Sequence, residues 1–325
     1  MAAKGGKPEV DDEFDFFQQH GERLEEDVEQ VDENGSDDRD DENDGKITVV
    51  RFDRIPRFLA HTGGTVVQGG VSTAYLLRAV NIAFAPRHPL CRLRVMFLRP
   101  FAPGDDKRAL VQRTILAPSA ERYEAEFVSQ DRGMIKKDVI CSFTFRENAG
   151  LAAIDRSHAR KPKRFGPNKP EDVVERKIVK EINRYTRLGG AEFRLHQFLG
   201  TRVTRFKDGT LRTNFSPAPS IVDKKGNIQQ GFLTAGLDAA MFLHLHVQGF
   251  LDGSSDIDGS TSLEFEVEFF SPARFGCELF CETEVLRIGQ SVAFFAAHLF
   301  QGSEQHELIA TAFQTIRIFR QHAKL

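Results

Sequence analysis

The chain contains the same sequence unit twice, and this repeat limits the folds that it can adopt. Gln68-Gly69-Gly70-Val71 opens an apolar segment at residues 71–84, and Gln230-Gly231-Phe232-Leu233 opens a second one at residues 233–247. A strand-like run follows each segment, and four of its residues recur with the same order and spacing: Val95, Phe97, Pro100 and Gly104 match Val267, Phe269, Pro272 and Gly276. Two copies of one structural unit are the simplest explanation.

Each unit continues with three runs in which apolar and polar residues alternate, a pattern typical of half-buried strands. The runs cover residues 109–117, 122–130 and 136–145 in the first unit, and residues 278–286, 291–301 and 308–319 in the second. The segment before them in each unit is predicted to be a helix that is apolar on nearly every face, so a sheet must wrap it. This combination predicts an α+β tandem, or double, hot-dog fold, with each long central helix wrapped by an antiparallel sheet.

Charge divides the chain further. Residues 1–45 carry 18 acidic and 4 basic side chains, whereas the remainder carries 29 acidic and 40 basic ones. The basic remainder suits an anionic ligand such as a nucleotide or coenzyme A, although RNA binding or simple solubility would also explain it. We therefore predict a disordered acidic tail (1–46), an N-terminal hot-dog unit (47–147), a basic linker (148–175), a C-terminal hot-dog unit (176–320) and a C-terminal tail (321–325).

No pattern in the sequence predicts a metal, a cofactor or a membrane span. Cys91, Cys141, Cys277 and Cys281 lie in apolar, strand-like runs without the spacing of a metal site, so we expect reduced thiols in the core. No stretch approaches 18 consecutive apolar residues, and the first residues lack a secretory or transit pattern. We expect neither a membrane span nor secretion.

Residues 47–147 and 190–319 resemble the acyl-CoA thioesterase II type, the double hot-dog thioesterases that act on fatty acyl-CoA. The similarity rests on QGGVSTAYLLRAV (68–80), VMFLRP (95–100), QGFLTAGLD (230–238), STSLEFEVEFFSP (260–272) and LIATAFQTIRI (308–318). The resemblance implies hydrolysis of fatty acyl-CoA to a fatty acid and free coenzyme A, with no cofactor and no nucleic-acid partner. It also implies a catalytic site of Asp238, Ser262 and Gln314.

Three positions depart from the family pattern. Ser262 stands where the family has threonine, Gln68 replaces an aromatic residue before the first Gly-Gly pair, and Glu264-Phe265 replaces an Asp-His pair. Serine keeps the hydroxyl of threonine but holds it less rigidly.

A carboxylate, a hydroxyl and an amide form a chemically sensible set for thioester hydrolysis. Asp238 would activate or orient a water molecule that Ser262 and Gln314 hold, and no covalent intermediate is required. An unpaired carboxylate in an apolar helix would cost several kcal/mol, so Asp238 must be paired, exposed or functional. Unsatisfied N–H groups at the start of the first helix could polarise the thioester carbonyl, which makes Gly69, Gly70 and Val71 candidate substrate-binding residues.

Several alternatives stay open. The main one is an acyl-CoA-binding or lipid-binding hot-dog protein without hydrolytic activity. Residues 70–74 resemble a degenerate nucleophile elbow of an α/β-hydrolase, and a hot-dog hydratase would act on the same ligands, although its usual Asn-Pro-x-His signature is missing. Thr261 could replace Ser262 if the strand register shifted by one residue. His244 and His246 lie two residues apart, on different faces of the helix, and are expected to be core or interface residues.

The helix position in the first unit that matches Asp238 is Leu76, which cannot act as a base. We therefore predict one active site per chain, with the first unit supplying the Gly-Gly wall. Arg160-Lys161-Pro162-Lys163-Arg164 could bind the coenzyme's phosphates, act as a nuclear signal or simply be solvated. Ala323-Lys324-Leu325 is a close variant of the Ser-Lys-Leu peroxisomal signal, so we expect the peroxisome and its import receptor, with the cytoplasm as the alternative. Association into a homo-oligomer is also open.

Overall fold

The computed structural model describes residues 29–31, 47–55, 60–61, 66–67, 69–99, 104–117, 119–131, 134–147, 173–188, 199–251, 257–302 and 306–320. The first unit contains β2 (Ile47–Ile55), α2 (Gly69–Phe84), β5 (Leu90–Phe97), β6 (Gly104–Ala117), β7 (Ala120–Asp131) and β8 (Met134–Arg146). The second contains α3 (Val173–Leu188), β9 (Arg202–Lys207), β10 (Thr210–Phe215), α5 (Gln230–Leu251), β11 (Ile257–Phe269), β12 (Leu279–Ile288), β13 (Val292–Gln301) and β14 (Glu307–Arg320).

Both units contribute to one antiparallel sheet. Its strand order is β1-β2-β6-β7-β8-β5-β11-β14-β13-β12-β10-β9, where β1 is Glu29–Val31. The order reads the same from both edges once β5 is matched with β11, β8 with β14, β7 with β13 and β6 with β12. The two units are therefore related by an approximate two-fold axis between β5 and β11, as expected for two copies of one unit. Two short strands, β3 (Ala60–His61) and β4 (Val66–Val67), pair separately.

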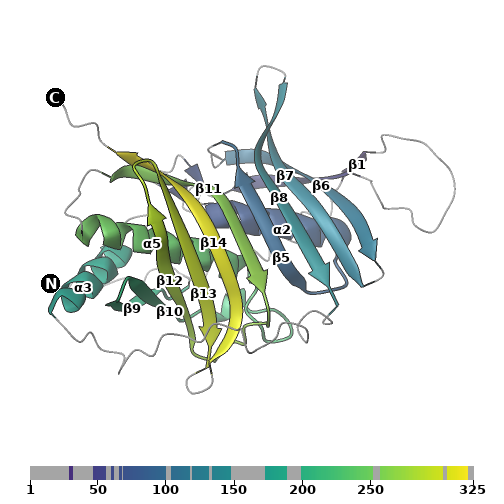
Figure 1. Ribbon diagram of the computed structural model, residues 1–325. Helices are drawn as coiled ribbons and strands as arrows, with labels where there is room; N and C mark the ends of the chain where they lie inside the picture. The colour runs from purple at the N-terminus through teal and green to yellow at the C-terminus, as the bar shows by residue number, and fades with distance from the viewer. Residues whose placement is uncertain are drawn as a thin grey trace, which may run out of the picture.

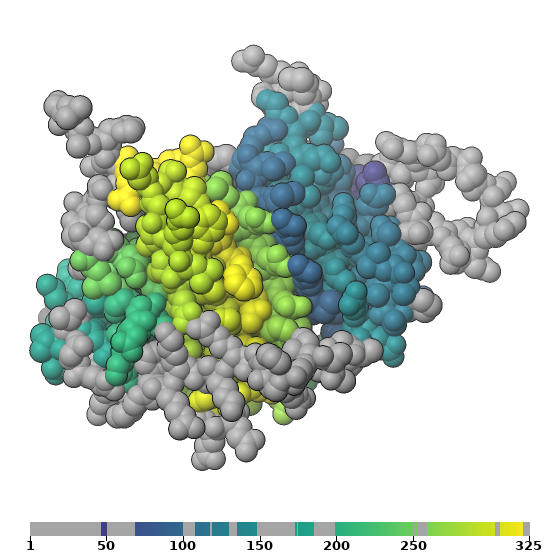
Figure 2. Space-filling model, in the orientation of Figure 1, coloured from purple at the N-terminus to yellow at the C-terminus, as the bar shows by residue number. Residues whose placement is uncertain are grey.

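The units are joined edge to edge through β5 and β11. Val95 pairs with Phe265 and Leu93 with Val267, and all four of these side chains are buried on the inner face of the sheet. On the outer face Arg94 forms an ion pair with Glu264 at 2.6 Å. Figure 2 shows the two units meeting in one continuous surface on this side of the molecule.

The helices α2 and α5 lie together on the other face of the sheet, α2 behind the strands of the first unit and α5 behind those of the second (Figure 1). Gly70 of α2 lies against Ala235 of α5, whereas Gly231 of α5 lies against Ala74 of α2. These contacts run in opposite directions along the two helices, so the helices pack antiparallel. Both helices are apolar on most faces because one side contacts the sheet and another contacts the partner helix.

The predicted central helices and three-stranded meanders are confirmed, but two predicted boundaries are wrong. Residues 29–31, placed in the disordered tail, form strand β1, which pairs antiparallel with β2. The edge of a sheet presents backbone N–H and C=O groups with which a further segment can pair. The last residues of the predicted linker belong to α3, whose Glu175 is buried and accepts hydrogen bonds from Arg205 Nε (2.7 Å) and the Phe206 N–H (3.0 Å). The Arg160–Arg164 cluster and the Ala323-Lys324-Leu325 terminus lie outside the described residues.

The four cysteines are unpaired thiols, as expected, but only two of them are core residues. Cys141 and Cys281 are buried, and burial raises the pKa of both thiols. Cys91 is half-buried at the start of β5, and Cys277 is exposed in the turn before β12. The strand-like context of Cys277 misled the prediction because the chain turns at Gly276, which has φ of 84°. Among the described residues, no helix is long and apolar enough to cross a membrane.

Candidate active site

The candidate site is built around Asp238, a fully buried carboxylate in the middle of α5. Its neighbours along the helix, Leu237 and Ala239, are buried in the apolar core. Burial of an ionised carboxylate is tolerated only where donors replace water around it. Asp238 has such donors from three other elements: α2, β11 and β14.

The three elements provide donors to both oxygens of the carboxylate. The Gly70 N–H, in the first turn of α2, donates to Oδ2 at 3.0 Å. The Ser262 hydroxyl of β11 donates to Oδ1 at 3.2 Å, and the Gln314 side-chain amide of β14 donates to the same oxygen. Gln314 Nε2 also donates to Ser262 Oγ at 2.9 Å. The structure therefore brings together all three residues of the predicted catalytic set.

Strand register determines which hydroxyl reaches the carboxylate. Ser262 is 4% exposed, whereas its neighbour Thr261 is only half-buried and pairs with Arg317 across β14. Successive side chains on a strand point to opposite faces, so Thr261 faces away from Asp238. The register alternative for Thr261 is therefore wrong in this structure. A register irregularity between Ser262 and Glu264 separates this end of β11 from the junction with β5.

Two glycines allow the first unit to approach the carboxylate. A Cβ atom on Gly70 would lie 2.7 Å from Ala235 Cα and 2.8 Å from Asp238 Cβ, and one on Gly69 would lie 3.0 Å from Ser262 Oγ. Such distances are too short for ordinary contacts, so the absence of side chains is what permits the Gly70 N–H to reach Asp238. The prediction that the Gly-Gly pair forms a wall of the site agrees with this placement.

The start of α2 also provides a favourable electrostatic environment. The first N–H groups of a helix carry a partial positive charge, and a carboxylate near them is stabilised. Asp238 accepts one of these N–H groups directly. The Gly70 amide was expected to polarise a substrate carbonyl, but here it donates to the Asp238 carboxylate instead. In this structure the Gly70 N–H holds the Asp238 carboxylate in place.

Gln314 has an acceptor that no described residue satisfies. Its Oε1 atom is buried, and within the described part of the chain no donor lies within hydrogen-bond distance of it. Buried polar atoms without a partner are rare in folded proteins, and many of them face a water or ligand position. The amide thus presents a donor to Asp238 and an acceptor toward the site.

The other residues considered from the sequence lie elsewhere. The Val71 side chain is buried and lines a cavity between the units, described below. His244 lies between the rings of Phe206 and Phe295, and its Nδ1 contacts Thr283 Oγ1 at 3.0 Å. Burial lowers the pKa of His244 to about 3, so this histidine is neutral at physiological pH and belongs to the core. No cluster of His, Cys, Asp or Glu suited to a metal ion occurs among the described residues.

Two further residues pack against the glycines of the site and could not be predicted from the sequence. Phe97 lies against Gly69, with its Cζ 2.9 Å from the position of a Cβ on that residue, and Ala235 closes the space beside Gly70. The repeat contained a signal for Phe97, because it matches Phe269, but apolar matches do not distinguish a core position from a site wall. Ala235 had no signal of its own.

Comparisons with known proteins agree with this architecture. Residues 226–307, which include Asp238 and Ser262, match the model of the Thioesterase superfamily. A conserved protein with a hot-dog fold from Alicyclobacillus acidocaldarius has a TM-score of 0.56 at 14% identity, covering 87% of this chain and 95% of that one. An acyl-CoA thioesterase II from Mycobacterium marinum has a TM-score of 0.51 at 16% identity, covering 92% and 98%.

A third structure, a tesB protein from Mycobacterium avium subspecies paratuberculosis, has a TM-score of 0.51 at 14% identity and covers 92% of this chain and 97% of that one. A search of curated protein sequences finds no match. At these identities the likeness is one of fold, and each of the three structural matches extends across both units. The chain has the tandem hot-dog fold.

Proposed function

We propose that this tandem hot-dog chain, whose second unit matches the thioesterase superfamily over residues 226–307, hydrolyses fatty acyl-CoA at Asp238. The observation that carries the proposal is the convergence of Ser262, Gln314 and the Gly70 N–H on one buried carboxylate. These residues come from four separate elements of both units. A purely structural explanation for a buried carboxylate with three donors does not account for the unsatisfied Oε1 of Gln314.

The geometry supports attack by water. A carboxylate accepts hydrogen bonds through both of its oxygens and can also take a proton from water, which suits it to act as a base. In the proposed step, the Gln314 Oε1 accepts one water hydrogen and Asp238 accepts the other as the water oxygen attacks the thioester carbonyl. The tetrahedral intermediate then collapses, the C–S bond breaks, and the sulfur leaves as coenzyme A thiol by taking up the proton that Asp238 accepted, which restores the carboxylate. The products are a fatty acid and free coenzyme A.

Stabilisation of the oxyanion falls to the start of α2. Because the Gly70 N–H is engaged by Asp238, the neighbouring amides of Gly69 and Val71 are the proposed donors for the developing negative charge. The helix dipole favours negative charge at the same place. The approach of a bulky thioester to this backbone requires the space that the two glycines provide.

The choice of coenzyme A thioesters rests on charge and on the resemblance to the acyl-CoA thioesterase II type. Outside the acidic N-terminal 45 residues, the chain carries 40 basic and 29 acidic side chains. A basic surface attracts an anionic coenzyme and raises its local concentration. The length of the acyl chain is set by the depth of the acyl-binding space, which the assay below measures.

The test is release of free thiol from acyl-CoAs of increasing chain length by the purified full chain and by Asp238→Asn. The wild type should turn over, and the variant should lose at least about 100-fold in kcat, equivalent to roughly 2.7 kcal/mol of transition-state stabilisation. Glu124→Gln is the matched control, since this carboxylate is exposed on β7 and pairs with Arg122, so its rate should equal that of the wild type.

Two outcomes would contradict the proposal. Tight binding of acyl-CoA with no thiol release by either protein would indicate a non-hydrolytic acyl-CoA-binding protein. Equal turnover by the wild type and Asp238→Asn would place the chemistry at another site.

A further inference from the structure

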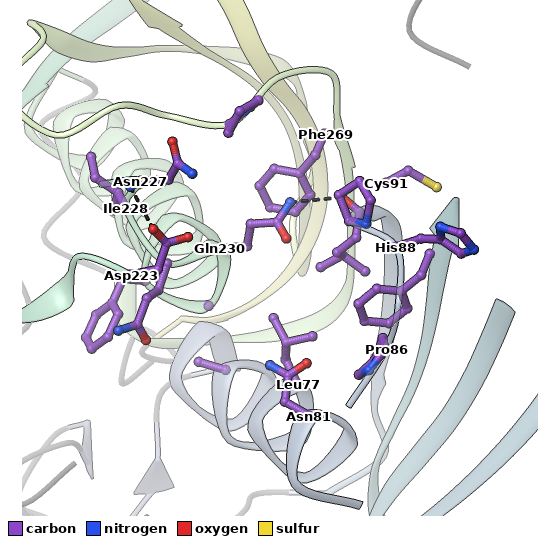
Figure 3. Close-up of a pocket in the computed structure, with 18 of the residues that line it drawn as sticks. Leu77, Asn81, Pro86, His88, Cys91, Asp223, Asn227, Ile228, Gln230 and Phe269 are labelled. Carbon is purple, nitrogen blue, oxygen red and sulfur yellow. Dashed lines mark hydrogen bonds between the residues drawn. The ribbon is translucent and has the colours of Figure 1, made fainter. Parts of the chain in front are cut away.

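A cavity of roughly 1360 Å³ lies between the two units, and none of Asp238, Ser262 and Gln314 lines it. Figure 3 shows its walls: Leu77 and Asn81 project from α2, and Gln230 projects from the start of α5. The volume exceeds the roughly 300–1,000 Å³ of ordinary small-molecule pockets, so the cavity has room for a long chain and a head group.

The approximate two-fold axis relates this cavity to the Asp238 site. The start of α5 lies at this cavity, as the start of α2 lies at the Asp238 site. The position that matches Asp238 is Leu76, a fully buried apolar residue. The N–H that corresponds to that of Gly70 belongs to Phe232, and it donates to the Gln229 carbonyl at 3.0 Å. This interface therefore has neither the base nor the amide contact that Gly70 makes in the other one.

The strand positions have lost their polar groups as well. Aligning β5 on β11 places Leu90 where the second unit has Ser262, and aligning β8 on β14 places Phe143 where it has Gln314. Leu90 and Phe143 are both buried, at 3% and 0% exposure. Carboxylate, hydroxyl and amide are all replaced by hydrocarbon, so the three positions that match Asp238, Ser262 and Gln314 cannot activate water here, although the interface retains a large open volume.

The lining of the cavity is apolar inside and cationic toward its rim. Leu77 and Phe269 are buried, while Arg87, Arg146 and Lys225 are exposed. Three acidic residues also line the cavity: Glu147, Asp223 and Glu268. The Asp223 carboxylate is held within its own turn, where it accepts hydrogen bonds from the backbone N–H groups of Lys225 and Asn227 at 2.8 Å.

Arg78 is the cation that lies deepest in this lining. It is half-buried on α2, about two turns from the buried Val71 and next to Leu77 in sequence. Burial lowers the pKa of its guanidinium group from the usual value, which is the effect of desolvating a cation. A desolvated arginine gains most from an anionic partner, and a guanidinium binds carboxylates and phosphates in a bidentate manner.

We propose that this cavity is a second, non-hydrolytic site for an anionic amphiphile, a long aliphatic chain that carries an anionic head group. The choice of ligand rests on the proposed function, because both the fatty acid product and the acyl-CoA substrate of that reaction have this chemistry. The chain would lie against Leu77 and Phe269, and Arg78 with the rim cations would hold the head group.

The test is isothermal titration of the full chain with three probes: hexadecanoate, coenzyme A alone, and a long-chain acyl-CoA analogue in which a ketone replaces the thioester. Asn81→Trp fills the mouth of the cavity from an exposed position, so the variant should fold. We expect the analogue or hexadecanoate to lose one binding event per chain in Asn81→Trp. In Arg78→Gln the Kd of that event should rise about tenfold or more, the loss of one charge-assisted hydrogen bond.

Arg122→Gln is the matched control, because Arg122 is exposed on β7 and does not line the cavity. Binding of hexadecanoate would identify the product as the ligand, and binding of the analogue alone would identify the intact acyl-CoA. Unchanged stoichiometry for every probe in Asn81→Trp would overturn the proposal. A raised KM for long-chain substrates in that variant, with no lost binding event, would also overturn it, by assigning the cavity to the acyl chain of the substrate at Asp238.

The failure of this inference is distinguishable from that of the proposed function. Loss of a binding event in Asn81→Trp in a chain that releases no thiol would support the second site and contradict hydrolysis. Normal thiol release, with the same number of binding events per chain in the wild type and Asn81→Trp, would support hydrolysis and contradict the second site.

Discussion

Replacing Gly70 with alanine should lower the proposed rate of thioester hydrolysis while leaving the chain folded. The new Cβ would lie 2.7 Å from Ala235 Cα and 2.8 Å from Asp238 Cβ, where ordinary contact begins at 3.4 Å. Both atoms are close to the backbone and cannot rotate away. Helices α2 and α5 must therefore separate locally by about the missing 0.7 Å, the difference between 3.4 and 2.7 Å.

That displacement acts directly on the carboxylate. The bond from the Gly70 N–H to Asp238 Oδ2 is 3.0 Å long and would stretch beyond hydrogen-bond distance. A hydrogen bond to a charged group contributes roughly 1.5–3 kcal/mol, which corresponds to a loss of about 10- to 150-fold in kcat. Overpacking between the helices should also lower the free energy of unfolding, by roughly 1–3 kcal/mol.

The assay is the initial rate of thiol release from a long-chain acyl-CoA, with a thermal melt of each protein. Gly231→Ala is the matched control, because its Cβ would meet Ala74 Cβ at 3.2 Å in the same helix pair but has no contact with the carboxylate. The control should lose a little stability and keep its rate. A folded Gly70→Ala with wild-type kcat, or an equal loss in both variants, would refute the positioning role of the Gly70 N–H.

The remaining predictions concern the hydroxyl, the amide and the buried charges. Ser262→Ala should lower kcat about tenfold or more and Ser262→Thr should largely restore it in the thiol assay, whereas equal rates would exclude a function for the hydroxyl. Gln314→Met should lower kcat by a similar factor and change the thermal midpoint little. An unchanged kcat would exclude a role for the Gln314 Oε1. Burial lowers the pKa of His244 from 6.5 to about 3, so the contribution of neutral His244 to the free energy of unfolding is complete above pH 6.5. Urea unfolding should show that stability falling toward pH 3 by up to about 1.4 kcal/mol per pH unit, a slope that His244→Asn should reduce. Glu282→Leu should destabilise the fold by about 3–5 kcal/mol by removing the carboxylate that pairs with buried Arg212, and denaturant titration of the double variant with Arg212→Leu should show recovery.

Much of this architecture could be predicted because the repeat constrains it. Matching Val95 to Val267 and Gln68 to Gln230 was enough to predict two central helices, and the alternating runs predicted the meanders that follow them. Asp238 could be identified because a carboxylate in an apolar helix requires partners. The outer strands β2 and β10 could not be predicted as readily, because charged residues interrupt the alternation of apolar and polar residues in them.

Contacts between the two units could not be predicted in this way. The distance from Gly70 to Asp238 depends on how closely two helices pack, which no local pattern encodes. The cavity next to Arg78 likewise depends on the placement of both units. The repeat identifies Leu76 as a position without a base, but the cavity at this interface can be found only in the three-dimensional structure.

The central claim is that water held by Asp238 attacks the thioester directly, and a single turnover in H₂¹⁸O tests it most directly. With enzyme in excess over a long-chain acyl-CoA, we predict one ¹⁸O atom in each fatty acid released, no acyl group on the intact protein by mass spectrometry, and no product from Asp238→Asn. An acylated protein, or a first-turnover fatty acid without ¹⁸O, would show that a side chain attacks first and would contradict the account.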